Sequence, residues 1–208
     1  MNTISIPEPV KIIAQHTTGN MVSCDSPHFI WANWILNDLS GSPIWEEATA
    51  CLIGYPLIEG KLGRDCTNPY TGQETEIKPS KYTQKMKERN NKHNGNAHFS
   101  DYTRKRFEKD KEDNLPIVQS FFSLDNQLQY IVEYPFECIA DRLDQVLTRQ
   151  EGKTKEGEIA SVRAASWDAK HWIKHCKVHY LNEKEIHLNR KIYTKSLYIA
   201  LCNMKEVQ

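Results

Sequence analysis

The chain has 208 residues, with 27 Lys and Arg balanced by 27 Asp and Glu, so its formal net charge is zero. This length suffices for one domain with its own hydrophobic core, and the charge balance excludes attraction to nucleic acid through net charge alone. The sequence has no run of 18 apolar residues and no apolar segment after Met1, which predicts a protein that neither spans a membrane nor is secreted. Six cysteines without a CxxC pair favour reduced thiols and a cytoplasmic location.

The first third of the chain predicts a strand, a helix and a further apolar segment. Residues 10–17 alternate enough to form a strand, and a helix over residues 26–41 is expected because apolar residues recur there at helical spacing after Asp25 and Ser26, which can cap it. Residues 48–55 are apolar and fit either a strand or a short buried helix. Residues 56–72 carry turn signals and predict a loop.

Residues 78–111 are strongly basic, with eleven Lys or Arg against four Asp or Glu. Because the segment has few aliphatic side chains and an Asn-rich middle, it predicts an exposed basic arm, inserted at about residues 60–115, that buries little apolar area. Its cations alternate with Tyr82, Phe99 and Tyr102, a mixture that suits phosphate pairing and base stacking on single-stranded RNA. The alternative is a solvated run of charges.

The second half shows the clearest periodicity. Residues 116–122 and 127–133 predict two strands around a turn at residues 124–126. A helix is expected to follow Pro135, and further strands are expected at 158–167 and in the tail, including 198–202. The apolar face of that helix consists of Ile139, Leu143, Val146 and Leu147. The pattern predicts an α+β fold with an antiparallel sheet and helices on one face.

The predicted helix ends in a loop with two glycines, Gly152 and Gly157, and with Lys153 and Lys155 between them. Glycines let backbone N–H groups approach a phosphate closely, and the lysines add positive charge. A nucleotide-binding P-loop is excluded because the required earlier glycine would be Leu147 and because that loop follows a strand. A helix C-cap with solvated lysines is the remaining alternative.

Three parts of the chain resemble the CRISPR-associated RAMP superfamily. They are residues 10–14 with 26–31, residues 102–106, and residues 131–134 with the helix, glycine loop and strand that end at Trp167. The similarity is to the small RAMP subunit of type IV CRISPR effector complexes. It implies a single domain over residues 1–208 with a ferredoxin-like (RRM-like) fold, and a noncatalytic subunit that binds and caps the 5′ handle of a crRNA. The implied partners are the crRNA, a repeated backbone subunit and a recruited helicase, with no membrane, metal or cofactor.

The residues expected to contact RNA combine the arm and the glycine loop: Lys81, Lys85, Arg89, Tyr102, Arg104, Lys105, Arg106, Gly152, Lys153, Lys155 and Gly157. Two alternatives stay open. One is a crRNA-processing endoribonuclease of the RAMP type, with His28, His93 or His98 as the base. The other is a small interaction protein whose basic arm binds an acidic partner. Trp172, which lies between basic residues, is expected to be a surface stacking residue.

Overall fold

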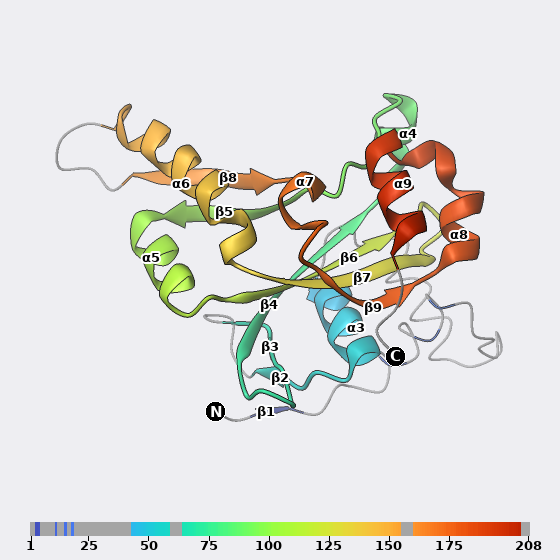
Figure 1. Cartoon of the computed structure of the whole chain (residues 1–208), viewed down its shortest axis with the longest axis horizontal. Coiled ribbons are helices and arrows are strands. Elements are labelled where there is room, and N and C mark those ends of the chain that lie inside the picture. Colours follow the sequence, from blue (N-terminus) through green and yellow to red (C-terminus); the bar gives the residue numbers. More distant parts are fainter. Residues whose placement is uncertain are drawn as a thin grey trace.

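The computed structural model describes residues 3–4, 11, 15, 18, 43–58, 64–154 and 160–204. Within these residues, a twisted sheet of seven strands crosses the molecule and carries helices on both faces (Figure 1). A smaller sheet of two strands lies beside it. No helix in the described part of the chain is both long and apolar enough to cross a lipid bilayer.

The main sheet is antiparallel except at one place. In order across the sheet its strands are β1 (Thr3–Ile4), β2 (Leu57–Ile58), β3 (Cys66–Thr67), β4 (Glu74–Lys81), β6 (Pro116–Phe122), β7 (Leu128–Pro135) and β9 (Lys177–Leu181). The exception is the pair β4 and β6, which run parallel. Parallel neighbours need a long crossover connection, and residues 82–115 form it.

The crossover contains three elements, α4 (Gln84–Glu88), β5 (Ala97–Thr103) and α5 (Arg104–Glu112). Strand β5 leaves the main sheet and pairs antiparallel with β8 (Ser161–Trp167). The remaining helices are α3 (Pro43–Ile53), α6 (Glu137–Glu151), α7 (Ala169–Trp172), α8 (Glu183–Leu188) and α9 (Lys195–Asn203), with a short 3-10 helix at Arg190–Ile192.

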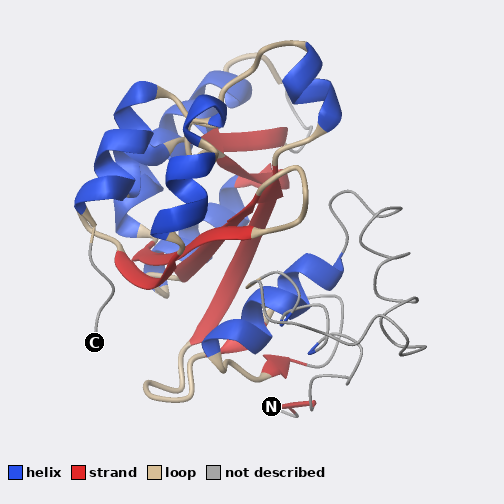
Figure 2. Cartoon of the chain, turned by 90° about the vertical axis from the view of Figure 1, so that its right-hand side faces the viewer, coloured by secondary structure: helices blue, strands red, loops and turns tan. Residues whose placement is uncertain are grey.

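The alternation of side chains along the central strands produces two apolar cores. Ile77 and Val118 point toward α3, whereas Ile117 and Phe121 point to the opposite face. Helix α3 covers the first face, and α6, α8 and α9 lie over the second (Figure 2). Two sequential residues of one strand therefore belong to different cores, which explains why all seven residues of β6 are buried.

Several sequence predictions are confirmed. The mixed α and β architecture with a mostly antiparallel sheet is present, and strands β6 and β7 form the expected hairpin. Helix α6 buries Ile139, Leu143 and Leu147, as its spacing predicted. Of the two alternatives for residues 48–55, the helix holds for most of the segment, since α3 spans Pro43–Ile53.

The basic segment differs from the expected arm. It is folded into the domain, and it buries the side chains of Tyr82, Phe99, Tyr102 and Phe107. The prediction that it buries little apolar area was wrong because aromatic rings supply the burial that aliphatic residues would otherwise provide. Stacking of Phe99 on Tyr102, with ring centroids 4.7 Å apart, shows how closely these rings pack.

Other expectations are also corrected. Residues 198–202 lie in helix α9 and not in a strand, residues 56–72 include β2 and β3, and helices cover both faces of the sheet where one was expected. Strand β8 begins at Ser161 and pairs with β5 outside the main sheet. Lys11 and Gln15, the described residues of the predicted strand 10–17, are helical. The predicted helix 26–41 and His28 lie outside the described residues.

Candidate active site

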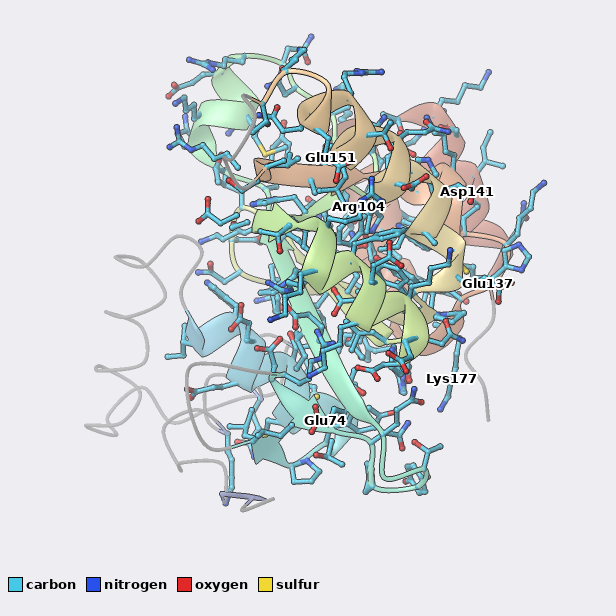
Figure 3. All side chains as sticks on the ribbon, turned by 90° about the vertical axis from the view of Figure 1, so that its left-hand side faces the viewer. Glu74, Arg104, Glu137, Asp141, Glu151 and Lys177 are labelled. Atoms are coloured by element: carbon cyan, nitrogen blue, oxygen red, sulfur yellow. The ribbon has the colours of Figure 1, made fainter. Side chains whose placement is uncertain are left out.

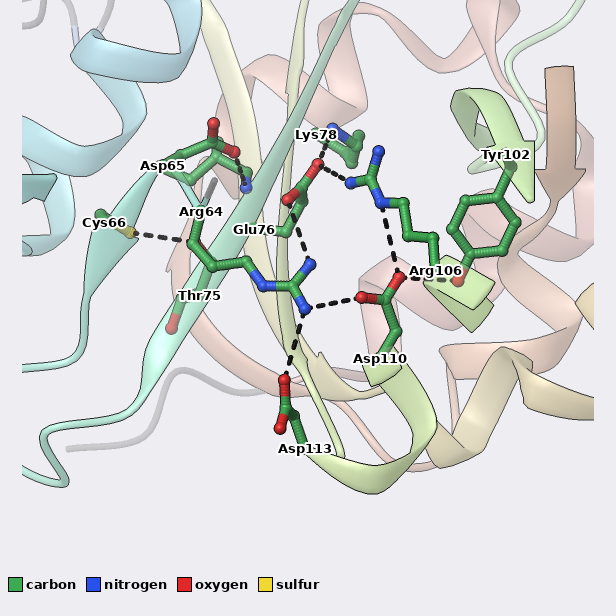
Figure 4. Close-up of polar contacts among 11 residues, drawn as sticks. Arg64, Asp65, Cys66, Thr75, Glu76, Lys78, Tyr102, Arg106, Asp110 and Asp113 are labelled. Atoms are coloured by element: carbon green, nitrogen blue, oxygen red, sulfur yellow. Dashed lines mark hydrogen bonds and ion pairs between the residues drawn. The ribbon is translucent and has the colours of Figure 1, made fainter. Parts of the chain in front are cut away.

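Strand β3 begins only at Cys66, and the side chain of the residue before it contacts β4. The two strands pair only at Cys66 with Thr75 and at Thr67 with Glu74, while β4 continues to Lys81. Just before β3, the Asp65 carboxylate accepts a hydrogen bond from the backbone N–H of Ile77, with Oδ2 2.6 Å from the nitrogen (Figure 4). The side chain of Asp65 thereby takes the position of the next ladder acceptor and is fixed against β4.

The alternation of β4 places an acid and a base on the same face. Ile77 points into the core beneath α3, so Glu76 and Lys78 point to the opposite face. There the Lys78 ammonium donates to Glu76, with Nζ 2.6 Å from Oε1. The Lys78 Nζ also lies 5.3 Å from the centre of the Phe99 ring. An acid and a lysine two residues apart on one strand form a fixed pair.

Glu76 is the most buried acid of this group, with only 5% of its surface exposed. Its Oε1 also accepts from Arg106 Nη2 at 3.0 Å. Its Oε2 has no hydrogen-bond donor within the described residues, and Arg64 Nη1 lies 3.8 Å away. Buried polar atoms without a partner are rare and costly in folded proteins. This oxygen is therefore held by the ion pair with Arg64 and not by a hydrogen bond.

Glu46 brings a third carboxylate from the first turn of α3. Burial, and next the negative charge of Asp65, raise the pKa of Glu46 to about 7. Burial, followed by the charge of Glu76, raises the pKa of Asp65 to about 6, and the positive charge of Lys78 opposes both shifts. The negative charges of Asp65 and Glu76 both act on the pKa of Glu46, and the charge of Glu76 acts on that of Asp65, so the three carboxylates share one electrostatic environment. We call Glu46, Asp65, Glu76 and Lys78 the β4 cluster.

A second layer of charges holds α5 against the cluster. Asp110, fully buried on α5, accepts from Arg64 Nη2 at 2.6 Å and from the Tyr102 hydroxyl at 2.7 Å. Arg64 is also 3.6 Å from Asp113, measured from Nη2 to Oδ2. Because Arg64 bridges Glu76 on β4 and Asp110 on α5, it fixes the crossover helix relative to the strand (Figure 4). A pocket of about 360 Å³ lined by Arg64, Lys109 and Asp113 opens beside this layer.

The donor set of the β4 cluster is suited to hard divalent cations. Carboxylate oxygens are the ligands that Mg²⁺ prefers, and the ion is usually held by one or two carboxylates together with water and substrate phosphates. In the part of the chain that the structure describes, no three His, Cys, Asp or Glu side chains are grouped so that they could hold a metal ion together, so protein carboxylates alone would not complete such a site. A lysine beside the carboxylates can bind a phosphate oxygen as a point charge.

The structure separates the predicted RNA-contacting residues of the crossover. Tyr102 is fully buried, so the prediction that it stacks on a base was wrong. Arg104 forms ion pairs with Asp144 and Glu151, and its Nη2 also donates to Thr148 (Figure 3). Arg104 therefore joins α5 to α6. The prediction that Arg104 binds a phosphate did not take into account Asp144 and Glu151, which lie 40 and 47 residues later in the chain.

The other basic residues that were expected to contact RNA lie in different surroundings. Lys81 is half-buried, and its Nζ lies 5.6 Å from the centre of the Trp45 ring. Four others are exposed to solvent: Lys85, Arg89, Lys105 and Lys153. They come from α4, α5 and the end of α6, and they do not form one ordered group with Tyr102 and Arg104.

The glycine loop is closed where the structure describes it. The N–H groups of Gly152, Lys153 and Thr154 donate to carbonyl oxygens of Thr148, Gln150 and Glu151 at 2.9 to 3.1 Å, as in a helix C-cap. Gly152 has a φ of −63°, which any residue can adopt. The three N–H groups are therefore not available to a phosphate, which supports the helix-cap alternative. Lys155 and Gly157 lie outside the described residues.

Two further expectations fail because of burial. His93 is enclosed in the core, stacked on Phe121 with ring centroids 3.6 Å apart, and its Nε2 lies 2.7 Å from the Tyr130 hydroxyl. It cannot reach an RNA substrate there. Trp172 is also fully buried and donates to the Gly95 carbonyl, so it is not a surface stacking residue. His98 is exposed on β5.

The sequence analysis did not single out the β4 cluster, although one signal was present. Glu76 and Lys78 have the period of a strand and so face the same side, and Asp65 precedes Glu76 by eleven residues across a turn. The contribution of Glu46 depends on how α3 packs and has no local signal. Neither a family model nor a curated protein matches this sequence closely enough to indicate its family.

Proposed function

We propose that this protein is a divalent-metal-dependent hydrolase that cleaves phosphodiester bonds in nucleic acid. The observations that carry the proposal are the Asp65 carboxylate held against β4, the buried pair of Glu76 with Lys78 on the same strand, and the influence of both acids on the pKa of Glu46. Carboxylates, a lysine and a bound divalent cation together suit displacement at phosphorus, because negative charge must be stabilised on several oxygens at once.

Each side chain of the cluster has a distinct role in this proposal. Asp65 and Glu76 would hold a Mg²⁺ or Mn²⁺ ion, which when bound polarises the phosphoryl group. The Lys78 ammonium would donate to a non-bridging phosphate oxygen. Glu46, a carboxylate in the first turn of α3, would accept the proton of the attacking water. The water oxygen bonds to phosphorus, the bond to the leaving oxygen breaks, and that oxygen takes a proton from solvent.

The distribution of charge supports a polyanionic substrate. Although the whole chain is neutral, the crossover and the strand before it carry an excess of seven positive charges over residues 78–111. Helix α5 begins with three consecutive basic residues beside the cluster, and Arg106 is one of them. A local basic surface next to carboxylates concentrates nucleic acid at the site where it is cleaved.

The test is cleavage of end-labelled DNA and RNA by the purified protein with Mg²⁺, Mn²⁺ or EDTA. Cleavage is expected only with a divalent ion, and Glu76→Gln should reduce the rate roughly 100-fold or more. Glu74→Gln is the matched control, since it removes an equal charge from the same strand two residues earlier. Cleavage that persists in EDTA, or that Glu76→Gln leaves unchanged, would contradict the proposal.

The noncatalytic role implied by the RAMP resemblance is a second proposal. In it the chain is a ferredoxin-like subunit that binds the crRNA 5′ handle in a type IV effector complex. The exposed cations Lys85, Arg89, Lys105 and Lys153 favour this role. Against it, β4 pairs directly with β6, where a split βαβ unit would place another strand between them. Copurification of a discrete crRNA, with no cleavage in Mg²⁺, would favour it over the hydrolase.

A further inference from the structure

We propose that this protein has a nucleotide-binding site in a pocket of about 570 Å³ between the crossover, the end of β8, α6 and α7. The ligand is a phosphorylated nucleotide, either free or at the end of a nucleic-acid strand. The residues that line the pocket are distinct from the β4 cluster, so the inference does not rest on the proposed hydrolase activity. The volume lies within the range of about 300 to 1,000 Å³ that small-molecule sites occupy.

An extended stretch of the crossover forms one wall of the pocket. Along residues 92–97 exposed and buried positions alternate, as they do along a strand. Lys92, Asn94 and Asn96 are the exposed members and line the pocket, whereas the residues between them are buried. The Asn-rich middle of the basic segment therefore places polar side chains in a row along one side of a folded stretch.

Hydrogen bonds of the backbone hold this wall in place. The Gly95 carbonyl accepts from Trp172 Nε1 and from Gln119 Nε2, each at 3.1 Å. The Asn94 carbonyl accepts from the backbone N–H of Ala169 on α7, also at 3.1 Å. These bonds use main-chain oxygens and leave the side-chain amide of Asn94 to a ligand. A wall that is fixed before the ligand arrives lowers the entropy cost of binding.

The charged side chains of the pocket favour an anion. Among the described residues, its Lys, Arg, Asp and Glu members are Lys92, Arg142, Lys170 and Asp168. Arg142 Nε donates to the Ser166 carbonyl at 3.2 Å, which fixes the guanidinium at the end of β8. Within the described part of the chain this is the side chain's one hydrogen bond, so its two terminal nitrogens are left for a ligand. Two N–H donors of this kind match the oxygens of a phosphate.

The rest of the lining suits a base better than it suits a phosphate alone. Asn94 and Asn96 each present a donor and an acceptor in one side-chain amide, a pair that matches the edge of a base such as N6 and N7 of adenine. Met86 from α4 adds a half-buried thioether, which packs well on an aromatic ring. A nucleotide combines the phosphate that fits Arg142 with the base that fits these side chains.

The test is calorimetric titration of the full-length protein with AMP, GMP, CMP and UMP in EDTA, which prevents metal-dependent cleavage. At least one nucleotide should bind. Inorganic phosphate and ribose 5-phosphate should bind roughly tenfold more weakly, because they lack the base. Phosphate or ribose 5-phosphate bound as tightly as every nucleotide, or no binding of any nucleotide, would overturn the proposal.

Two pairs of variants locate the ligand. Arg142→Gln should weaken nucleotide binding roughly tenfold, because a charged hydrogen bond is lost. Arg149→Gln, which removes an exposed charge from the same helix, is the matched control. Arg142 also joins α6 to β8, so Lys170→Glu provides a test at a side chain that is 73% exposed, with Lys174→Glu as its control. Equal affinities in Lys170→Glu and Lys174→Glu would contradict the assignment of the pocket.

A tetranucleotide with and without a 5′-phosphate distinguishes the two sources of the ligand. If the phosphorylated tetranucleotide binds more tightly than the mononucleotide, the ligand is the end of a strand, and the reverse order identifies a free nucleotide. Both results support the site. Equal binding of the two tetranucleotides, together with unchanged binding in Arg142→Gln, would overturn the role of Arg142 as a phosphate ligand.

Discussion

The β4 cluster and the loop that ends α6 both place lysines beside groups that can bind ions, but they differ in what the fold leaves unpaired. In the loop, the described N–H groups of Gly152 to Thr154 all have carbonyl acceptors. In the β4 cluster, Oε2 of Glu76 has an ion pair with Arg64 but no hydrogen-bond donor among the described residues, and burial raises the pKa of Glu46 and Asp65. The loop is the more conspicuous of the two in the sequence. The comparison teaches that unsatisfied groups, more than the density of lysines or glycines, indicate a reactive site.

The largest effect is expected when single charges are removed from the β4 cluster. Asp65→Asn and Lys78→Ala should each lower kcat for DNA or RNA cleavage by roughly 100-fold to 1,000-fold. The reason is that each removes a group aimed at the metal or the phosphate. Single-turnover kinetics measure the effect. A loss of less than threefold in either variant, with the fold intact by circular dichroism, would contradict the assignment.

The next largest effect concerns Gly95 and is measured as stability. Gly95 has a φ of +72°, and a Cβ atom there would lie 2.6 Å from the Cβ of Ala169 and 2.9 Å from the Trp172 ring. Gly95→Ala should therefore lower the free energy of unfolding by about 2 to 3 kcal/mol in urea denaturation. An unchanged midpoint would show that the contact between the crossover and α7 can adjust freely.

A pH titration tests how firmly the crossover is built into the core. Burial lowers the pKa of His93 to about 3, from the ordinary value of 6.5. Below pH 6.5 the unfolded chain binds a proton at His93 that the folded chain does not bind. The free energy of unfolding should therefore fall by about 1.4 kcal/mol for each pH unit as the pH is lowered from 6.5 to about 3.

His93→Gln separates this proton from the other acid-titrating groups. The variant loses the stacking on Phe121, so it should be less stable at pH 7, but its stability should fall less steeply between pH 6.5 and 5 than that of the wild type. Urea midpoints measured across this range give both slopes. Equal slopes would mean that His93 can be protonated in the folded protein and that the core around it opens.

The smallest expected effect is at Gly152. A Cβ atom there would lie 3.6 Å from the Thr148 carbonyl oxygen, an ordinary contact, and the backbone φ suits any residue. Gly152→Ala should change the free energy of unfolding by at most about 1 kcal/mol, in the stabilising direction, because alanine restricts the unfolded chain. Nucleic-acid affinity, measured by filter binding, should not change. A marked loss of affinity would restore the loop as a phosphate site.

The sequence predicted those helices and strands whose apolar residues recur at a regular spacing within a short stretch of chain. The β6 and β7 hairpin and the apolar face of α6 follow from spacing within a few residues, and both are present. The crossover was misread because Phe99 and Tyr102, which pack inward, also fit an RNA-stacking pattern. The β4 cluster was missed because Glu46, Asp65 and Glu76 meet only after α3, β3 and β4 have packed, and no local pattern encodes that packing.

The parallel pairing of β4 with β6 affects the order in which the protein folds. The strands pair from Glu76 with Ile117 to Lys81 with Phe122, and the 34 residues between them must be closed into place first. Closing such a connection costs chain entropy before the contacts that offset this cost have formed. Non-local strand pairing of this kind therefore forms slowly. Arg106 reaches Glu76, and Asp110 reaches Arg64, only through this closure. A chain still emerging from the ribosome would therefore leave Glu76 without its partner Arg106 until the crossover has closed.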